Sequence, residues 1–177
     1  FVGMLGLPLV PTARIDANAK AAFFPVHSLK DPQFKAKLKK MTAAGKPLLL
    51  TDGLAKRLTG IDLEKHNIVT LEVAGNPKNL LKLSRKELRP IRDKLLAPFA
   101  MKFDAPNKVA LYLIGDNCVI VENFNGEIID AALEFPRPVK ARKTLILPVD
   151  GNVELAAAGA ELRFTKMTPR TLVVIEY

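Results

Sequence analysis

The sequence predicts two folded parts of different class: an α/β module with a parallel sheet over residues 1–100, and a small antiparallel β-sandwich over residues 107–177. Three observations carry this prediction. Before residue 100, apolar runs alternate with segments of helical periodicity, as in βαβ units. After Pro106, six or seven short apolar runs are separated by turn residues at regular intervals. Two of these runs are separated only by Asn125-Gly126, a pair typical of a type I′ hairpin turn.

In the first part, apolar runs at residues 21–26, 46–51 and 67–73 predict buried strands of the parallel sheet. Residues 1–20 contain two glycines and two prolines, and predict a short strand near residues 7–10 followed by a connection. The segments after the first two buried strands have helical features, so the order is strand, helix, strand, helix.

The first helix has recognisable ends. Asp31-Pro32 is typical of a helix start, because the aspartate side chain accepts from early N–H groups and proline suits the first helical position. Gly45 is suited to the residue that ends the helix in a left-handed conformation. The apolar face repeats at helical spacing through Phe34, Leu38 and Met41. A second, short helix is expected over residues 54–58.

A later helix begins with a capping box, formed by Ser84 and Glu87. Pro90 lies inside this helix and predicts a kink or two short helices, because proline lacks an N–H and crowds the preceding turn. Residues 98–106 are expected to link the two parts.

The second part predicts strands over residues 109–114, 118–124, 127–135, 144–149, 153–155, 161–166 and 172–177. A two-residue hairpin loop at Asn125-Gly126 fixes the register of the second and third strands. It pairs Phe124 with Glu127, Ile120 with Ala131, and Cys118 with Leu133. Cys118 and Ile120 would then face the core together with Ile129, Ala131, Leu133 and Phe135, and Cys118 would be a small buried hydrophobe.

Composition limits the function classes. The 177 residues are 49% apolar and 25% charged, with a net charge of +9. The positive charge permits polyanion binding, but the lysines are spread along the chain and favour solvated faces, so a nucleic-acid partner is not expected. Cys118 is the only cysteine, which leaves no intrachain disulfide. No apolar run approaches the length of a membrane span.

Four polar residues predict a candidate ligand site. His27 and Ser28 follow the first buried strand, and Thr51 and Asp52 follow the second. Ligands of open α/β sheets bind at the carboxyl ends of the strands, so these side chains would converge on one crevice if the strands are neighbours. The alternative is that they cap helices and shape turns.

Catalytic chemistry is otherwise unsupported, and we expect no catalytic residue, cofactor or metal. The sequence has neither G-x-S-x-G nor a phosphate-binding glycine motif. Cys118 lies inside a predicted strand, away from both histidines, and two histidines alone do not form a metal site.

Two stretches resemble a known family. Residues 21–60, with a strand ending at His27-Ser28 and the run AGKPLLLTDG, are similar to flavodoxin-like, glutamine-amidotransferase-like modules that follow the catalytic barrel of some bacterial glycosidases, where they are called the β-galactosidase trimerisation domain. Residues 109–177 resemble the small C-terminal β-domain of many glycoside hydrolases. The amidotransferase nucleophile and the catalytic barrel are both missing. The resemblance implies an incomplete flavodoxin-like module and a β-sandwich from a larger, exported, carbohydrate-related protein.

We therefore expect a non-catalytic structural or interaction module, whose partners are neighbouring domains of a longer chain or further copies in a homo-oligomer. The chain starts at Phe1 rather than Met, which is consistent with a piece of a longer protein. The alternatives are a ligand-binding or hydrolytic domain that uses His27, Ser28, Thr51 and Asp52, and polyanion binding through the basic surface.

Overall fold

The computed structural model describes residues 1–140 and 143–177 and divides the chain into two compact units. The α/β unit is Val10–Leu80, and the β unit combines Phe1–Leu9 with Leu81–Tyr177. The chain has the expected mixture of one parallel sheet and antiparallel sheets. The boundaries of these two units differ from those of the expected parts, residues 1–100 and 107–177. The reason is that the helix before residue 100 and the N-terminal segment both pack on strands of the β unit.

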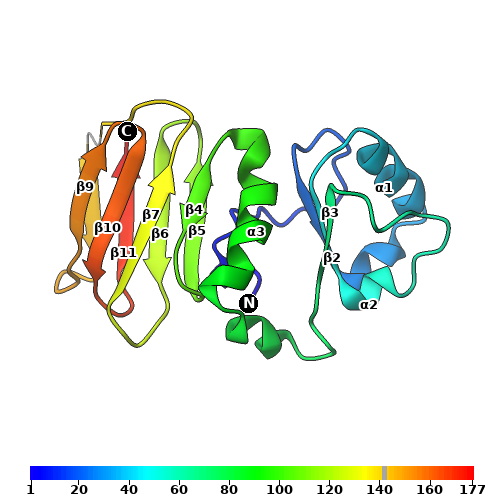
Figure 1. The fold of residues 1–177 in the computed structure, drawn as a ribbon, viewed down its shortest axis with the longest axis horizontal. Helices are drawn as coiled ribbons and strands as arrows, with labels where there is room; N and C mark the ends of the chain where they lie inside the picture. Colours follow the sequence, from blue (N-terminus) through cyan, green and yellow to red (C-terminus); the bar gives the residue numbers. More distant parts are fainter. Residues whose placement is uncertain (141–142) are drawn as a thin grey trace. The chain divides into compact units, whose positions relative to one another are not determined.

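The α/β unit contains the predicted parallel sheet, which is confirmed. β1 (Ala22–Phe24), β2 (Leu48–Thr51) and β3 (Ile68–Leu71) lie in that order, with β2 in the centre (Figure 1). α1 (Phe34–Ala43) follows β1, and the short α2 (Asp52–Ala55) follows β2 directly. The core contains the apolar face predicted for the first helix and residues of the central strand: Phe34, Leu38, Met41, Leu48 and Leu50.

The C-terminal end of α1 matches its sequence signal, but the N-terminal end does not. Gly45 has a φ of 68°, the left-handed conformation, and its N–H donates to the carbonyl of Thr42 at 3.0 Å. At the other end, Oδ1 of Asp31 accepts from the N–H of Gln33 at 2.8 Å. The helix itself begins only at Phe34, so Asp31 shapes the turn before it.

α3 (Arg85–Leu96) begins with the predicted capping box, which is confirmed. The N–H of Ser84 donates to Oε2 of Glu87 at 2.7 Å, and the N–H of Glu87 donates to Oγ of Ser84 at 3.3 Å. The helix continues through Pro90, so the expectation of two short helices is wrong. Pro90 forfeits only the single bond to the carbonyl four residues earlier, and the apolar face of the helix supplies enough packing to keep it continuous.

The β unit consists of two four-stranded antiparallel sheets, ordered β4-β7-β10-β9 and β5-β6-β11-β8. Their strands are β4 (Lys102–Asp104), β5 (Val109–Ile114), β6 (Cys118–Asn123), β7 (Ile129–Glu134), β8 (Lys143–Leu147), β9 (Glu154–Ala158), β10 (Glu161–Met167) and β11 (Leu172–Glu176). The two sheets form layers (Figure 1), and their inner faces share one core that includes Val121, Leu133 and Phe164. β4 falls within residues 98–106, which were expected to be a linker.

The hairpin expected across Asn125-Gly126 is wrong. β6 pairs with β5 and β11 in one sheet, whereas β7 pairs with β4 and β10 in the other. The connection between them therefore crosses from one layer to the other. None of the predicted cross-strand pairs forms, because the two strands are not neighbours.

The inward face of β6 also differs from the expected one. Val119, Val121 and Asn123 are buried, while Cys118 and Ile120 are half-buried and face outward. β6 is apolar on both faces, so a one-residue shift in register leaves its hydrophobic pattern nearly unchanged. The inward face predicted for β7, the third expected strand of the second part, is confirmed: Ile129, Ala131 and Leu133 are buried.

Candidate functional site

The predicted crevice has the expected backbone arrangement. β1 and β2 are parallel neighbours, so the residues that follow them lie at the same edge of the sheet. His27 and Ser28 belong to a 3₁₀ turn, Val26–Lys30, which contacts α2. The His27 side chain is exposed, and Ser28 is half-buried.

The other two residues of the crevice act on the main chain. Oγ1 of Thr51 accepts from the N–H of Leu54 at 3.4 Å and caps α2. The Asp52 carboxylate is buried and accepts from the N–H groups of Val73 and Ala74, both at 3.1 Å. Thr51 and Asp52 thus secure the start of α2 and the segment after β3.

The environment of Asp52 favours its charged form. Burial raises the pKa of this carboxyl, but the backbone hydrogen bonds and the nearby Lys56 outweigh burial and lower the pKa below its usual value. Nζ of Lys56 lies 3.6 Å from Oδ2. Ala74 has a φ of 49°, a strained value for a residue with a Cβ, and its bond to Asp52 helps to hold it there. A stably ionised, fully bonded carboxylate suits a structural role better than proton transfer.

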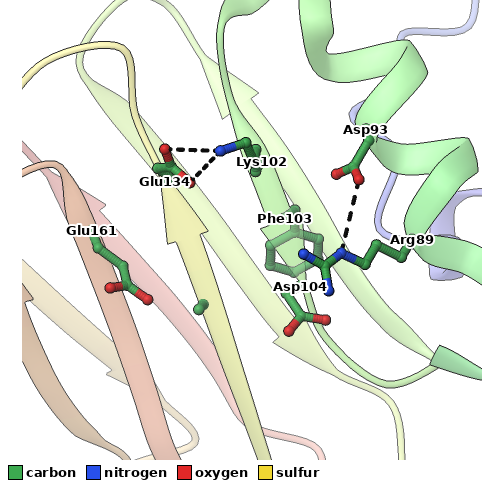
Figure 2. Close-up of a pocket in the computed structure, with 8 residues that line it drawn as sticks. Arg89, Asp93, Lys102, Phe103, Asp104, Glu134 and Glu161 are labelled. Carbon is green, nitrogen blue, oxygen red and sulfur yellow. Dashed lines mark hydrogen bonds and ion pairs between the residues drawn. The ribbon is translucent and has the colours of Figure 1, made fainter. Parts of the chain in front are cut away.

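A groove in the β unit lies between α3 and the outer side of the β4-β7-β10-β9 sheet (Figure 2). Its volume is about 130 Å³, smaller than the ~300–1,000 Å³ typical of small-molecule sites. Lys102 pairs with Glu134 at 2.9 Å across its floor, and Arg89 lies 3.9 Å from Asp93 on the helix. Because its charges are engaged with one another, the groove presents no convergent set of unpaired groups.

Among the residues that the structure describes, Arg92 is the most deeply buried charged side chain, with no exposed area. Its guanidinium donates to three main-chain carbonyls: Leu5 at 2.6 Å, Pro106 at 3.0 Å, and Ala105. It also lies over the ring of Phe103, 5.2 Å from the centroid. Burial lowers its pKa to about 10. Arg92 ties α3 to the N-terminal segment and to the connection between β4 and β5.

Asn123 has the same kind of role where the chain leaves β6. Its amide nitrogen lies 3.1, 3.2 and 3.0 Å from the carbonyls of Glu127, Met167 and Thr168, and Oδ1 accepts from the N–H of Asn125 at 2.9 Å. The side chain is fully buried. Sequence reasoning missed Arg92 and Asn123, although Arg92 stands on the apolar stripe of its helix, four residues from both Leu88 and Leu96.

The outer side of the β5-β6-β11-β8 sheet carries several apolar side chains that remain partly or largely exposed. The strand registers place one apolar side chain from each strand in a row across the whole sheet: Tyr112, Ile120, Val174 and Leu145. The neighbouring rows are mixed: Ile114 and Cys118 stand in one row with Glu176, and Leu147 and Leu172 stand in the other with Glu122. We call the eight apolar residues named in these three rows the apolar face. Ile114, Leu145 and Leu147 are 52%, 49% and 43% exposed.

The other sheet has an outer side of opposite character. Its outward residues are mostly charged: Lys102, Asp104, Asp130, Glu134, Glu154, Glu161 and Arg163. Several form ion pairs, including Lys102 with Glu134 and Arg163 with Glu161 at 3.0 Å. A hydrogen bond from Arg85 is the main cause that lowers the pKa of Asp104. This charged face is what a solvated antiparallel sheet normally carries, and the apolar face is not.

No known protein family, curated protein or solved structure matches the chain. Within the described part of the chain, no three His, Cys, Asp or Glu side chains group as they would around a metal ion. None of the helices in residues 1–140 and 143–177 is long and apolar enough to cross a membrane.

Proposed function

We propose that this chain is a non-catalytic interaction module and that the apolar face of the β unit is its contact surface. The observation that carries the proposal is the contrast between the two outer sides of the β unit. In a sheet with one solvated face, polar outward residues alternate with apolar inward residues along each strand. Contiguous exposed apolar patches of several hundred Å² mark interaction sites. The apolar face departs from the solvated pattern across all four strands, from Tyr112 on β5 to Leu145 on β8.

The buried polar side chains support a structural interpretation of the rest. Asp52, Arg92 and Asn123 bind main-chain groups, and so does Asn67, whose amide donates to the carbonyl of Lys46 at 2.7 Å. Catalytic groups instead need an accessible reacting atom and a partner that tunes them. These side chains are fully used in holding loops and element ends.

The resemblance of residues 21–60 and 109–177 to accessory regions of bacterial glycosidases is consistent with this role. On that basis we place the module in a larger, exported, carbohydrate-related protein. The α/β unit would be an incomplete flavodoxin-like module, and the β unit a small β-sandwich. The three parallel strands and the two facing sheets support this description.

The competing function is ligand binding or hydrolysis at the crevice of His27, Ser28, Thr51 and Asp52. It is favoured by the convergence of two strand ends and by the exposed His27 side chain. Polyanion binding is weaker, because basic groups such as Lys37, Lys102 and Lys166 already pair with carboxylates.

An NMR titration with two probes separates these functions. Bis-ANS, an apolar anionic dye, should shift the amide signals of Ile120, Leu145 and Val174, since these residues lie in the centre of the apolar face. Galactose and glucose at millimolar concentration should leave the signals of His27 and Ser28 unchanged. Saturable sugar shifts confined to the crevice, with no dye shifts at the apolar face, would replace the proposed function with the competing one.

A further inference from the structure

We infer that the free edge of β9 binds an extended, acidic peptide segment of another protein as an additional strand of its sheet. This second contact surface belongs to the other sheet of the β unit, apart from the apolar face, and it does not depend on the proposed function. Three observations lead to it: the direction of the main-chain groups of β9, the exposure of this edge, and the charge at one end of it.

β9 is the last strand of its sheet, and among the described strands it pairs with β10 alone (Figure 1). In an antiparallel ladder, alternate residues direct their N–H and C=O groups to the same neighbouring strand. The carbonyl of Ala160, just before β10, accepts from the N–H of Phe135 at 2.9 Å, so the even-numbered residues through Phe164 are turned toward β7 and the odd-numbered residues toward β9. These odd-numbered residues pair with the even-numbered residues of β9. The main-chain groups of Leu155 and Ala157 therefore point away from the sheet.

The chain itself already binds this edge at one position. The carbonyl of Gly159, the next outward residue after Ala157, accepts from the N–H of Val139 at 3.1 Å. Over the described residues, no partner follows for the outward groups of Ala157 and Leu155. An added strand would continue the pairing that begins at Gly159.

Two of the four sheet edges of the β unit are covered, whereas β9 is exposed. α3 lies against β4, and the 3₁₀ turn Gly3–Leu5 lies against β5. In β9 four of the five residues are exposed, and Leu155 is half-buried. Ala157 is exposed even though its cross-strand partner Leu162 belongs to the core. The margin of the core is thus open beside β9.

β9 also lacks most of the devices that prevent strand addition. Proteins protect free edges with prolines, bulges or charged side chains. β9 contains no proline, and its pairing with β10 is regular. Its single charged residue, Glu154, lies at the start of the strand and pairs with Lys166 at 2.6 Å. The other side chains are small or apolar, so the backbone of an added strand can approach as it does in β-augmentation.

The charge near Gly159 indicates the chemistry of the added strand. Arg137 and Lys140 flank Val139, which binds Gly159, and both side chains are exposed. The chain as a whole carries a net charge of +9. Acidic residues at the end of a peptide beside Gly159 would be attracted, whereas a second copy of the chain would be repelled. Apolar side chains at alternate positions of the peptide would lie beside Leu155 at the margin of the core.

The experiment titrates the 177-residue chain with the synthetic peptide acetyl-DEVTVTVT-amide and follows amide hydrogen exchange by NMR. In the free chain the amides of Leu155 and Ala157 should exchange rapidly, because they point into solvent. The peptide should slow the exchange of both amides at least about tenfold at saturation. A peptide of the same sequence with its main-chain nitrogens methylated has no N–H to donate, and it should give no protection.

Two variants locate the binding on the chain. Ala157→Pro removes one outward N–H and should weaken peptide binding about tenfold, as expected for the loss of one main-chain hydrogen bond. Ala157→Val keeps this N–H and is the matched control, so it should bind like the wild type. Arg137→Glu/Lys140→Glu should weaken binding at least about threefold and reduce its dependence on salt. Unchanged amide signals of β10 will show that each variant is folded.

Equal protection by the methylated peptide, or no protection of Leu155 and Ala157 by the unmodified one, would overturn the inference. So would a stable dimer of the free chain in sedimentation equilibrium that Ala157→Pro abolishes, in favour of a second copy. If Ala157→Pro does not fold, the comparison of the two peptides on the wild-type chain still decides the question. None of these outcomes affects dye binding at the apolar face, which tests the proposed function separately.

Discussion

At the scale of single residues, the buried polar side chains act as main-chain clamps. Arg92 joins three carbonyls from two distant segments, and Asn123 joins the chain after β6 to the carbonyls of Met167 and Thr168. A buried carbonyl that loses its donor costs about 1–3 kcal/mol, so each clamp carries a sizeable part of the stability of its unit.

Arg92→Leu should lower the free energy of unfolding of the β unit by about 3 kcal/mol, because three buried carbonyls lose a charged donor. The measurement is urea unfolding at neutral pH. Arg89→Leu on the same helix is the matched control, since Arg89 is largely exposed and its pairing distance to Asp93 is 3.9 Å. It should change the free energy by less than about 0.5 kcal/mol. Equal losses of unfolding free energy in both variants would contradict the proposed role of Arg92 in binding these carbonyls.

Asp52 makes the stability of the α/β unit depend on pH. Its folded-state pKa is lowered, so its carboxylate stabilises the fold above the unfolded value of 3.8, and this contribution is lost as the pH falls through the folded pKa. Asp52→Asn should cost about 1–2 kcal/mol at pH 7 and progressively less in acid, since the amide keeps only one acceptor.

The check on Asp52 is urea unfolding of the α/β unit at a series of pH values, followed through amide signals of β2. Glu72→Gln, which changes an exposed carboxylate of the same unit, is the control and should follow the wild-type curve. A cost of Asp52→Asn that stays constant down to about pH 2.5 would show that the carboxylate charge is unimportant.

At the scale of elements, the sequence predicts best where a local rule has one solution. The Ser84–Glu87 capping box and the Gly45 helix end are both present, because each is set by a few neighbouring residues. The sequence predicted approximately where most strands of the β unit lie, but it did not predict which strands pair with each other. Asn125-Gly126 permits a hairpin, yet the buried Asn123 side chain binds the loop and the carbonyls of distant residues, and the chain crosses to the other sheet.

Asn123→Ala should destabilise the β unit by about 2–3 kcal/mol, because the carbonyls of Met167 and Thr168 are left without this donor in the interior. Chemical unfolding monitored by circular dichroism measures the loss. Asn117→Ala, in an exposed turn of the same unit, should cost less than about 0.5 kcal/mol. If the two alanine variants are equally stable, the Asn123 side chain does not hold the crossing.

At the scale of the whole molecule, the β unit presents two outer sides of different chemistry, and sequence reasoning did not find this. On the charged face, charged outward residues alternate with apolar inward residues along the strands, and this pattern can be recognised in the sequence. The apolar face depends on which strands are neighbours, and the wrong hairpin turned Cys118 and Ile120 toward the core. The crevice residues were placed at one edge by the parallel order of β1 and β2, which local patterns do predict.

The central claim is that the apolar face is an accessible contact surface, and fluorescence titration with bis-ANS tests it most directly. The variant Leu145→Lys/Leu147→Lys places charges on two exposed positions of the edge strand β8. Ala156→Lys/Ala158→Lys makes the matched change on the edge strand β9, where both residues are exposed on the charged face. We predict that the first variant weakens dye binding about tenfold, a loss of ~1.4 kcal/mol, while the second binds like the wild type. Equal dye binding by both variants and the wild type would contradict the claim.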